Sequence, residues 1–390
     1  MSKIVTGIDV GSHHVKVVIA EESQDPRVPP QILGTGYAES RGVAKGYVTS
    51  PAEASRSVAA ALAQAQKAAR VKVRRAYVSV GGLGLEEARC RGEVVVERGD
   101  SVVTERDVPR AAKASEAALP PASVLNRKIL HAIPLGYYVD GVQVLGRNPI
   151  GMKGSKLAVE TLFITCLERH VDALVEAIEE AGVEVEDVVA GPIAASLIAL
   201  NRMQKRVGCI LLNIGSETLS AIVYEDSLPI SLKVFHVGSA DITNDLALSL
   251  RISPEEAEQL KSGAVLGATY PKKKVDDTIA RRLHEMFKQV EQYLKKLGKD
   301  SLLPAGAVLT GGGAMTPLAT DAAKSVLRLP ARIAALGEDS ARWQLNGGNW
   351  AVAYGLTVWG ASGAELEGGF GGGFTDMLKG LWRWFKKFLP

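Results

Sequence analysis

The chain has 390 residues, of which 46% are hydrophobic and 23% are charged, a globular composition that excludes collagen-like, mucin-like and wholly disordered proteins. At about 150 residues per domain, this length predicts two or three domains. The formal net charge of +3 argues against a dedicated nucleic-acid binder, and three cysteines without a CxxC motif favour neither a disulfide framework nor a zinc site. A reducing compartment fits this cysteine usage.

The opening residues lead into no long apolar segment, so we expect no secretory signal. No stretch approaches the roughly 20 apolar residues that a spanning helix needs.

In chain order, residues 4–21 predict a β-hairpin, because runs of β-branched residues flank a Gly-Ser turn. Apolar residues at helical spacing predict a helix over 53–70, and residues 71–82 predict a strand that ends in glycines. The next segment, 83–160, reads as a small inserted α+β subdomain. Its expected elements are a strand over 89–98, a helix over 104–118 capped by Thr104, and strands over 129–134, 137–142 and 157–166. A helix over 168–181, a strand over 183–189 and a helix opening at Gly191-Pro192 follow.

A second hairpin over 208–225 repeats the first. A constant offset of 204 places Asp9 on Asn213, Gly11 on Gly215, Ser12 on Ser216 and Glu21 on Glu225. Two apolar hairpins that share a Gly-Ser turn at one offset predict two halves of similar fold.

Turns of small residues present backbone N–H groups that can cradle phosphate, and the hydroxyls of Ser12, Ser216 and Thr218 add donors. A carboxylate beside such a turn, here Asp9, can hold the water shell of Mg²⁺. A third glycine run, over 309–315, follows a strand predicted for 305–310 and allows close approach of a flat ring or a sugar. Each turn alone is more often merely structural, but the three together favour a nucleotide site. His13 and His14 read as loop residues near phosphate rather than metal ligands.

The last residues form a separate segment. Half of residues 362–373 are glycine, which predicts a flexible tether. The following 17 residues hold four basic residues and one acidic residue, so their net charge of +3 equals the formal net charge of the whole chain. Their apolar positions recur every three or four residues, which predicts an amphipathic helix over 374–389 that lies in a membrane interface. The apolar face comprises Phe374, Met377, Leu378, Leu381, Trp382, Phe385, Phe388 and Leu389, and the basic positions are Lys379, Arg383, Lys386 and Lys387. A helix docked on the body or on a partner is the alternative.

The ordered motifs carry a family resemblance. Gly7-Ile-Asp-Val-Gly-Ser, Asn213-Ile-Gly-Ser-Glu-Thr and Leu309-Thr-Gly-Gly-Gly resemble the phosphate-1, phosphate-2 and adenosine motifs of the actin/Hsp70/hexokinase superfamily. Further stretches are similar to the bacterial cell-division FtsA family: Gly42-Val-Ala-Lys-Gly-Tyr-Val, Ala76-Tyr-Val-Ser-Val-Gly-Gly, His131-Ala-Ile-Pro-Leu-Gly-Tyr-Tyr-Val-Asp-Gly and Asn148-Pro-Ile-Gly-Met-Lys-Gly-Ser-Lys-Leu.

The resemblance implies an α/β fold of duplicated actin-like (ribonuclease H-like) domains around a nucleotide cleft, with an inserted α+β subdomain 1C. The implied boundaries are 1–82 for the first part of subdomain 1A, 83–160 for 1C, 161–203 for the rest of 1A, 204–240 for the first part of 2A, 241–300 for 2B, 301–360 for the rest of 2A with a return to 1A, 361–373 for the linker and 374–390 for the membrane helix.

The resemblance also implies a site for ATP and Mg²⁺. Its residues are Asp9 (to the metal through water), Gly11, Ser12, His13 and Lys16 in the first loop, Asn213, Gly215, Ser216, Glu217 and Thr218 in the second, Glu258 and Lys261 on a helix beside the adenosine, and Gly311, Gly312, Gly313 and Met315 in the adenosine loop. Many superfamily members have Asp where this chain has Asn213, which bears on metal affinity and on hydrolysis. We therefore expect ATP binding with weak or absent hydrolysis.

By the same resemblance we expect an actin-like filament, formed on anionic lipids at the cytoplasmic face of the cell membrane and at the division site. The implied partners are the C-terminal peptide of FtsZ, bound through Arg281 and Arg282, and other divisome proteins, with no nucleic acid. Two alternatives stay open: an actin-fold adaptor similar to PilM, and a small-molecule kinase of the same superfamily.

Overall fold

The computed structural model describes residues 3–25, 28–97, 101–263, 270–336, 343, 345 and 348–362. The chain divides into two compact units: residues 1–83 with 173–361 make up the first, and the second contains residues 84–172. The linker and membrane helix predicted for 361–390 lie outside the described residues from residue 363 onward.

The first half of the first unit is a five-stranded sheet of order β11-β6-β1-β2-β3. Its strands are β1 (Ile4–Val10), β2 (His14–Glu21), β3 (Gln31–Glu39), β6 (Arg75–Val80) and β11 (Glu184–Ala190). Helix α1 (Pro51–Ala69) packs on β2 and β3, and the two-stranded pair β4 (Val43–Ala44) and β5 (Tyr47–Val48) precedes it. Helix α4 (Glu168–Glu180) leads into β11, and α5 (Gly191–Ala199) follows it.

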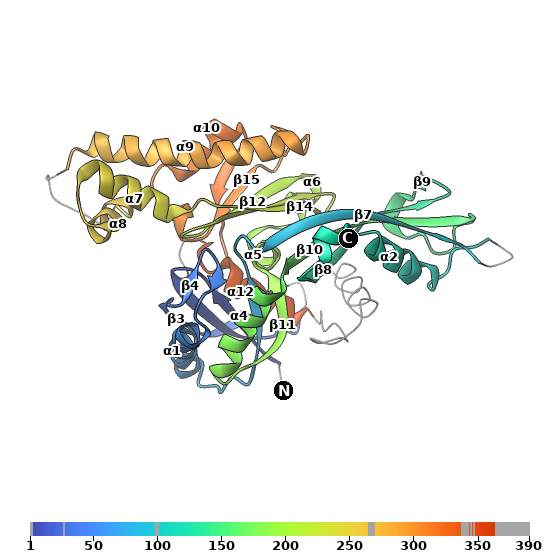
Figure 1. The fold of residues 1–390 in the computed structure, drawn as a ribbon, viewed down its shortest axis with the longest axis horizontal. Helices are drawn as coiled ribbons and strands as arrows, with labels where there is room; N and C mark the ends of the chain where they lie inside the picture. Colours follow the sequence, from blue (N-terminus) through green and yellow to red (C-terminus); the bar gives the residue numbers. More distant parts are fainter. Residues whose placement is uncertain are drawn as a thin grey trace. The chain divides into compact units, whose positions relative to one another are not determined.

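The second half has a five-stranded sheet of order β14-β13-β12-β15-β16. Its strands are β12 (Cys209–Ile214), β13 (Leu219–Glu225), β14 (Leu228–Phe235), β15 (Ala307–Thr310) and β16 (Ala331–Ile333). The helical elements of this half are α6 (Arg202–Val207), α7 (Ser239–Leu250), α8 (Pro254–Lys261), α9 (Lys272–Lys296), η2 (Gly312–Met315) and α10 (Ala319–Leu327). Helix α9 is long and amphipathic and lies beside α10 (Figure 1). Its buried face includes Leu283, Phe287 and Val290, spaced three and four residues apart, and joins the core formed by β12 and β15.

The two sheets repeat one topology. In each, a central strand pairs antiparallel with the next strand and parallel with a later one: β1 with β2 and β6, and β12 with β13 and β15. The hydrogen bond from Gly11 N to His14 O at 3.2 Å recurs, at the same offset of 204, as that from Gly215 N to Thr218 O at 2.9 Å. The predicted duplicated actin-like fold is therefore confirmed.

The last described helix, α12 (Ala351–Ala361), packs against α5 and against β1 of the first sheet. Two glycines permit this approach. A Cβ on Gly7 of β1 would lie 2.2 Å from the carbonyl oxygen of Ala353, and one on Gly355 would lie 1.9 Å from that of Ala194. The backbones are therefore too close for any side chain at these two positions.

The second unit is a four-stranded sheet of order β7-β10-β8-β9 with α2 packed on β7 and β10. Its elements are β7 (Leu85–Val95), α2 (Asp107–Ala117), α3 (Pro121–Val124), β8 (Arg127–Val139), β9 (Val142–Gln143), η1 (Leu145–Arg147) and β10 (Lys156–Leu167).

Two local expectations for this unit were wrong. The segments 129–134 and 137–142 were expected as separate strands, but β8 continues without a break from Arg127 to Val139, and a turn at 140–141 leads into β9. The register shift at Glu160/Thr161 of β10 accommodates Pro134, which has no N–H for the ladder. Thr104 does not cap a helix that begins beside it. Helix α2 starts at Asp107, and both the backbone N–H and the hydroxyl of Thr104 donate to the Asp107 carboxylate, at 2.9 and 2.7 Å.

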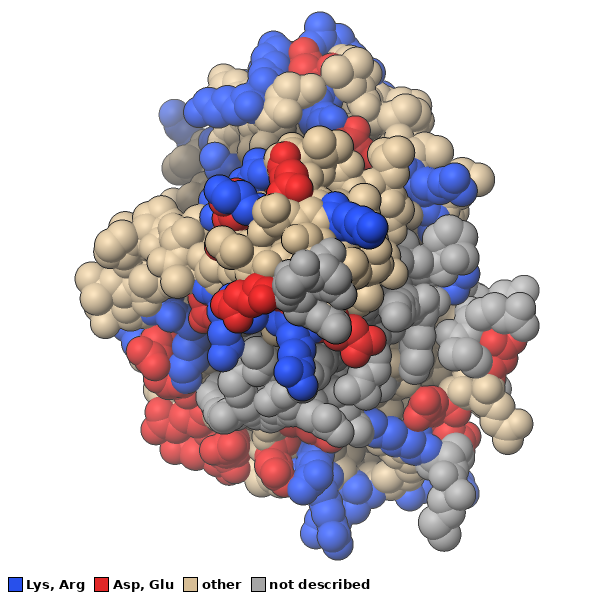
Figure 2. Space-filling view, turned by 90° about the vertical axis from the view of Figure 1, so that its right-hand side faces the viewer, with Lys and Arg blue, Asp and Glu red and all other residues tan. Residues whose placement is uncertain are grey.

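Basic and acidic side chains are interspersed over the face of the molecule that Figure 2 displays. Across the described part of the chain, every helix is too short or too polar to cross a lipid bilayer.

Candidate nucleotide site

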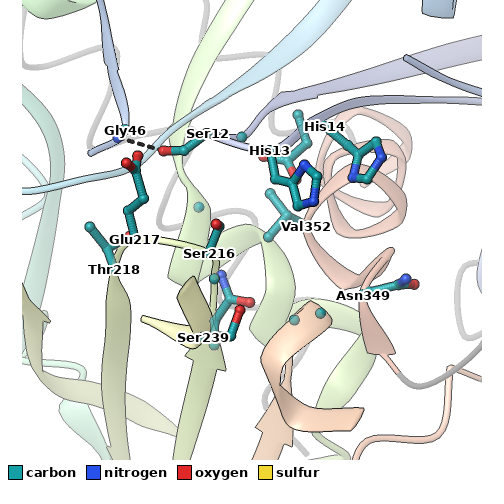
Figure 3. Close-up of a pocket in the computed structure, with 18 of the residues that line it drawn as sticks. Ser12, His13, His14, Gly46, Ser216, Glu217, Thr218, Ser239, Asn349 and Val352 are labelled. Atoms are coloured by element: carbon teal, nitrogen blue, oxygen red, sulfur yellow. Dashed lines mark hydrogen bonds between the residues drawn. The ribbon is translucent and has the colours of Figure 1, made fainter. Parts of the chain in front are cut away.

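A cavity of about 480 Å³ lies within the first unit, where the two hairpin turns, α8 and the loop after β15 meet (Figure 3). This volume is in the range of small-molecule and cofactor pockets. Its walls come from both halves of the duplicated fold, so a ligand in it would touch both.

The first turn contributes an aspartate to the site. Asp9, the penultimate residue of β1, accepts a hydrogen bond from the hydroxyl of Ser79 at 2.7 Å. Lys16 faces Asp9 across the β1–β2 ladder. Desolvation lowers the pKa of Lys16, while the nearby Asp9 charge acts to raise it. An anion entering the cavity would meet a lysine whose charge is only partly compensated, which favours anion binding.

The second turn repeats this arrangement with a neutral side chain. Asn213 lies opposite Thr310 of the parallel strand, as Asp9 lies opposite Ser79. The hydroxyl of Thr310 donates to Asn213 Oδ1 at 3.4 Å. The two equivalent positions therefore hold one carboxylate and one amide, and of these two residues only Asp9 carries a full negative charge.

A short segment of the first half is tied to both turns. The backbone N–H of Gly46 donates to Ser12 Oγ of the first turn at 2.9 Å. The backbone N–H of Lys45 donates to Glu217 Oε2 of the second turn at 2.5 Å. Figure 3 shows Ser12 and Glu217 directed toward this segment. Gly46 also packs on Gly82, where a Cβ on either residue would lie within 2.9 Å of the other's Cα. The Glu217 carboxylate, expected to contact the nucleotide, is thus engaged with the protein backbone.

Helix α8 places an ion pair at the cavity wall, in which Lys261 is buried and Glu258 is partly exposed. The Lys261 ammonium donates to Ser239 O, Thr243 Oγ1 and Glu258 Oε2, at 3.2, 2.9 and 2.6 Å. These three bonds use every proton of the ammonium group. Burial opposes ionisation of Glu258, but hydrogen bonds from Lys261 and Thr243 outweigh it and lower its pKa. Lys261 therefore has no proton left to donate to a ligand, and it would attract an anion in the cavity only through its positive charge.

The loop after β15 forms a narrow part of the wall. Gly311 has a φ of +85°, which favours glycine, and its N–H donates to Gly348 O at 3.3 Å. Nothing lies within 4 Å of the Cβ position of Gly312, so the space in front of it is open. Gly313 is not among the lining residues. A Cβ there would lie 2.4 Å from Ile214 Cγ2, so this glycine allows the loop to pack on β12.

His13 and His14 stack on one another at the cavity, with ring centroids 4.3 Å apart (Figure 3). Burial is the largest cause of the lowered pKa of His14. The charges of His13 and Lys16 lower it further, and Glu39 opposes them. A negatively charged ligand would offset this repulsion between cations.

The structure brings together all the predicted nucleotide-site residues except Gly313. The residues that line the cavity are Asp9, Gly11, Ser12, His13, Lys16, Asn213, Gly215, Ser216, Glu217, Thr218, Glu258, Lys261, Gly311, Gly312 and Met315. Sequence reasoning missed further lining residues, namely Val10, Gly46, Ser79, Gly81, Gly82, Gly191, Pro192, Ser239, Ser262, Thr316, Asn349 and Val352. One signal was present: Gly81-Gly82 ends β6 as Gly311-Gly312 ends β15.

The proposed partner residues lie elsewhere, on α9. Arg281 is exposed. Arg282 forms a bidentate ion pair with Asp245 of α7, at 2.8 and 2.9 Å, and also contacts Glu285 at 3.1 Å. The expected membrane residues Phe374, Leu378, Lys379, Leu381, Trp382, Arg383, Phe385, Lys386, Lys387 and Phe388 lie outside the described residues.

The donor set of the cavity fits a nucleotide whose phosphates carry Mg²⁺. Within the described ranges no cluster of three or more His, Cys, Asp or Glu side chains could chelate a metal ion by itself. Mg²⁺ commonly keeps several waters and binds through one or two carboxylates together with substrate phosphates. The Asp9 carboxylate beside the first turn matches that mode.

Comparison with known proteins places this geometry in a family. The profile described as "Cell division protein FtsA" matches residues 210–355, and that described as "SHS2 domain inserted in FTSA" matches residues 84–165. The cell division protein FtsA of Borreliella burgdorferi is 29% identical over 352 residues, covering 85% of this chain and 84% of that protein. The FtsA of Pseudomonas aeruginosa is 26% identical over 354 residues, with 85% and 82% covered.

Among solved structures, one titled "PilM-PilN type IV pilus biogenesis complex" matches with a TM-score of 0.68 and 20% identity, covering 92% of this chain and 98% of that one. This likeness shows the actin-like fold alone. The SHS2 profile on the inserted unit and the FtsA profile on the second half match one family, with relatives of that family along most of the chain. The chain belongs to the FtsA family of actin-like cell-division proteins.

Proposed function

We propose that this protein binds ATP with Mg²⁺ in the cavity between its duplicated halves. The observation that carries the proposal is the repeated turn. Gly11 and Gly215 make the same backbone hydrogen bond at the same offset, and both turns line one cavity. Small residues at both turns leave backbone N–H groups accessible to phosphate oxygens. Lys16 supplies positive charge, and Asp9 supplies a carboxylate for the water shell of the metal.

We propose that hydrolysis is weak or absent. Of the two equivalent positions before the turns, only Asp9 is a carboxylate, because the position in the second half is Asn213. An amide can hydrogen-bond a water molecule but draws no proton from it at neutral pH. Bound ATP would then act as a stable bridge between the halves rather than as a substrate consumed quickly.

Two glycine substitutions test ATP binding. Gly312→Asp places a carboxylate in open space at the cavity, so it should fold and repel the nucleotide. Gly11→Glu adds the same charge at the first turn, where a Cβ lies 3.0 Å from His14 O. We expect both to abolish binding measured by isothermal titration calorimetry. Gln292→Glu, which adds one negative charge on the exposed face of α9, is the control. Binding that survives both glycine changes would refute the site.

At the cellular level, we propose that the protein assembles into an actin-like filament on the cytoplasmic membrane and tethers the FtsZ ring at the division site, helping to recruit other divisome proteins. Support comes from the cell-division names of its relatives and from the amphipathic pattern over residues 374–389. Electron microscopy on an anionic lipid monolayer with ATP tests the filament. Isolated molecules at high surface density would contradict it.

The membrane contact has its own test. We expect anionic liposomes to sediment the intact chain but neither a 1–361 truncation nor Trp382→Glu, because both remove apolar surface from the amphipathic segment. The basic residues of that segment would each gain about 1 kcal/mol near anionic headgroups. Equal sedimentation of all three proteins would refute the anchor.

We propose that the C-terminal peptide of FtsZ binds on the α7–α9 face near Arg281 and Arg282. Arg281 is exposed and can pair with an acidic residue of the peptide. Fluorescence anisotropy with Arg281→Glu tests this contact, and unchanged peptide affinity would remove Arg281 from the binding surface.

The two alternatives have less support. A PilM-like adaptor shares the fold, but the match of residues 84–165 to the insert characteristic of FtsA favours the cell-division assignment. A small-molecule kinase would need a catalytic aspartate facing a second substrate, and Asp9, the aspartate at the first turn, already accepts a hydrogen bond from Ser79. A phosphorylation assay on a panel of sugars distinguishes this function.

A further inference from the structure

Two histidines stand side by side on one wall of the cavity, at the first hairpin turn. His13 and His14 both line the cavity (Figure 3), and their rings stack with centroids 4.3 Å apart and an angle of 21° between the planes. His14 opens β2, and Lys16, two residues further along this strand, also lines the cavity. The segment 13–16 therefore brings two titratable rings and a lysine to a single wall.

Strand β3 packs against this pair and offers it one acid. Glu39 lies opposite His14 in the β2–β3 ladder, and its carboxylate also forms an exposed ion pair with Arg41 at 3.7 Å. Tyr37, the other titratable group of β3, meets the His14 ring edge-on with centroids 5.8 Å apart, and a tyrosine is neutral near pH 7. Glu39 accordingly has the smallest effect on the pKa of His14.

The acids of the other neighbouring elements are already engaged with the protein. Asp9 of β1 faces Lys16 across the β1–β2 ladder. Glu258 of α8, whose charge acts on the first histidine of the pair, accepts a hydrogen bond from Lys261 at 2.6 Å. Glu217 of the second turn accepts from a backbone N–H. The negative charge near the histidines is thus largely balanced by other groups.

The protonated form of the pair therefore needs a further anion. Two imidazolium rings at this distance repel each other, and the lysine beside them adds to the repulsion. Burial, His13 and Lys16, in that order, lower the pKa of His14. A phosphate group in the cavity would supply the missing negative charge and favour protonation. Histidine is the side chain whose ordinary pKa lies close enough to neutral for such a change to move a proton.

We propose that nucleotide binding draws a proton onto the His13–His14 pair, so that the affinity of the site for ATP rises as the pH falls. This inference rests on the proposed ATP site and adds a regulator to it, the concentration of protons. The sign follows from linkage, because a ligand that binds the protonated form better takes up protons and is favoured at lower pH. The rise ends where the pair is already protonated without a ligand.

Titration calorimetry of the full chain with ATP and Mg²⁺ counts these protons. The heats measured near pH 7 in Tris and in PIPES, two buffers of different ionisation enthalpy, give the number of protons taken up. We expect the pair to take up about 0.3 to 1 proton per ATP, which makes the affinity about 2- to 10-fold higher for each pH unit of decrease.

The double variant His13→Gln with His14→Gln removes both titrating rings and keeps polar side chains. It should lose the proton uptake of the pair and the rise in affinity that goes with it. His284→Gln is the matched control, because His284 is exposed on α9 and does not line the cavity, and it should keep both. Protons that ATP itself gains or loses are common to all these proteins and cancel in the comparison. Thermal unfolding without nucleotide checks that each variant is folded.

Proton NMR of the unaltered protein gives a second readout that needs no folded variant. The chain has 6 histidines, so their ring signals can be followed individually through a pH titration. With ATP and Mg²⁺ bound, at least one ring signal should titrate at a higher pH than without nucleotide. The single variants His13→Gln and His14→Gln then assign that signal to the pair.

If the unaltered protein and the double variant take up the same number of protons on binding ATP, the inference is overturned while the ATP site stands. It is likewise overturned if ATP binds and no histidine signal titrates at a higher pH. If the unaltered protein binds no ATP at any pH, the proposed function falls and the inference with it.

Discussion

The Glu217 carboxylate accepts a hydrogen bond from the backbone N–H of Lys45, although 172 residues separate them in the chain. Glu217 belongs to the second hairpin turn, and Lys45 belongs to the segment that follows β4 in the first half. Together with the bond between Gly46 and Ser12, this contact links the two halves directly at the cavity. Because Glu217, Ser12 and Gly46 all line the cavity, these bonds hold part of its wall in place.

We therefore expect Glu217→Ala to speed nucleotide release by about 10-fold or more, the effect of losing one hydrogen bond to a charged group. Stopped-flow displacement of a fluorescent ATP analogue measures this rate. Glu217→Gln is the matched control, because its amide oxygen can still accept from Lys45, and it should remain near the unaltered rate. An alanine variant that releases nucleotide at the unaltered rate would show that the contact does not restrain the ligand.

We expect Gly355→Ala to destabilise the protein by about 1–3 kcal/mol, the usual cost of overpacking. Helix propensity alone predicts the opposite, since Ala is favoured over Gly by up to about 1 kcal/mol. Overpacking should dominate because the new methyl would lie 1.9 Å from the carbonyl oxygen of Ala194, a backbone atom on α5. Gly312→Ala, with nothing within 4 Å of its Cβ, is the control. Thermal unfolding without nucleotide decides the sign, and an increase in Tm for Gly355→Ala would contradict the packing described.

The carboxylate of Glu291 gives the fold an acid-sensitive point. Glu291 is 5% exposed and forms ion pairs with Lys288 at 2.8 Å and with Lys295 at 2.9 Å. Arg328, the residue that follows α10, also contacts this carboxylate at 3.4 Å. Hydrogen bonds from Lys288 and Lys295 lower its pKa to about 2. Because the folded-state pKa lies below the ordinary value, Glu291 stabilises the fold above pH 4.5, and this contribution is lost as the pH falls toward 2.

Glu291→Gln should therefore lower the Tm at pH 7, and its difference from the unaltered protein should shrink between pH 4.5 and pH 3. Glu179→Gln, on the exposed face of α4, is the control and should follow the unaltered protein at every pH. A difference that stays constant down to pH 3 would mean that Glu291 acts through packing rather than charge.

We expect Arg282→Glu to destabilise the protein by about 2 kcal/mol, the value of a charge-assisted hydrogen bond, because it breaks the bidentate pair with Asp245. The double variant Asp245→Arg with Arg282→Glu restores opposite charges and should recover part of the loss. Urea unfolding measures each free energy. Arg281→Glu, at an exposed position, should change it by less than about 0.5 kcal/mol. Additive effects in the double variant would exclude a direct pair.

The duplicated halves were predictable from sequence because one turn recurs at a fixed offset, and the same offset aligns the hydrogen bonds of Gly11 and Gly215. The parts of the cavity wall that Ser79, Gly46 and Asn349 contribute were not predictable from the sequence. Each comes from a segment whose local sequence is an ordinary strand end or turn, and only sheet pairing brings it to the cavity. Ser79 reaches Asp9 because β6 pairs parallel with β1, a contact over 70 residues that no local pattern records.

The inserted unit shows a different limit. Pro134 divides an apolar run, and local rules read it as a strand end. The sheet instead absorbs it with a register shift, because β10 provides partners along the whole length of β8. Long-range pairing thus overrides a local signal that is correct in most strands.

The packing of α12 has a consequence for how the protein is made. A ribosome releases β1 long before α12, yet α12 is the helix that covers β1, with Ala353 against Gly7. The nascent first sheet therefore emerges with one apolar face unprotected until α12 has been synthesised. Dependence on chaperones during translation should then increase with the delay before residue 361 leaves the exit tunnel. A circular permutation that moves α12 ahead of β1 should shorten that delay.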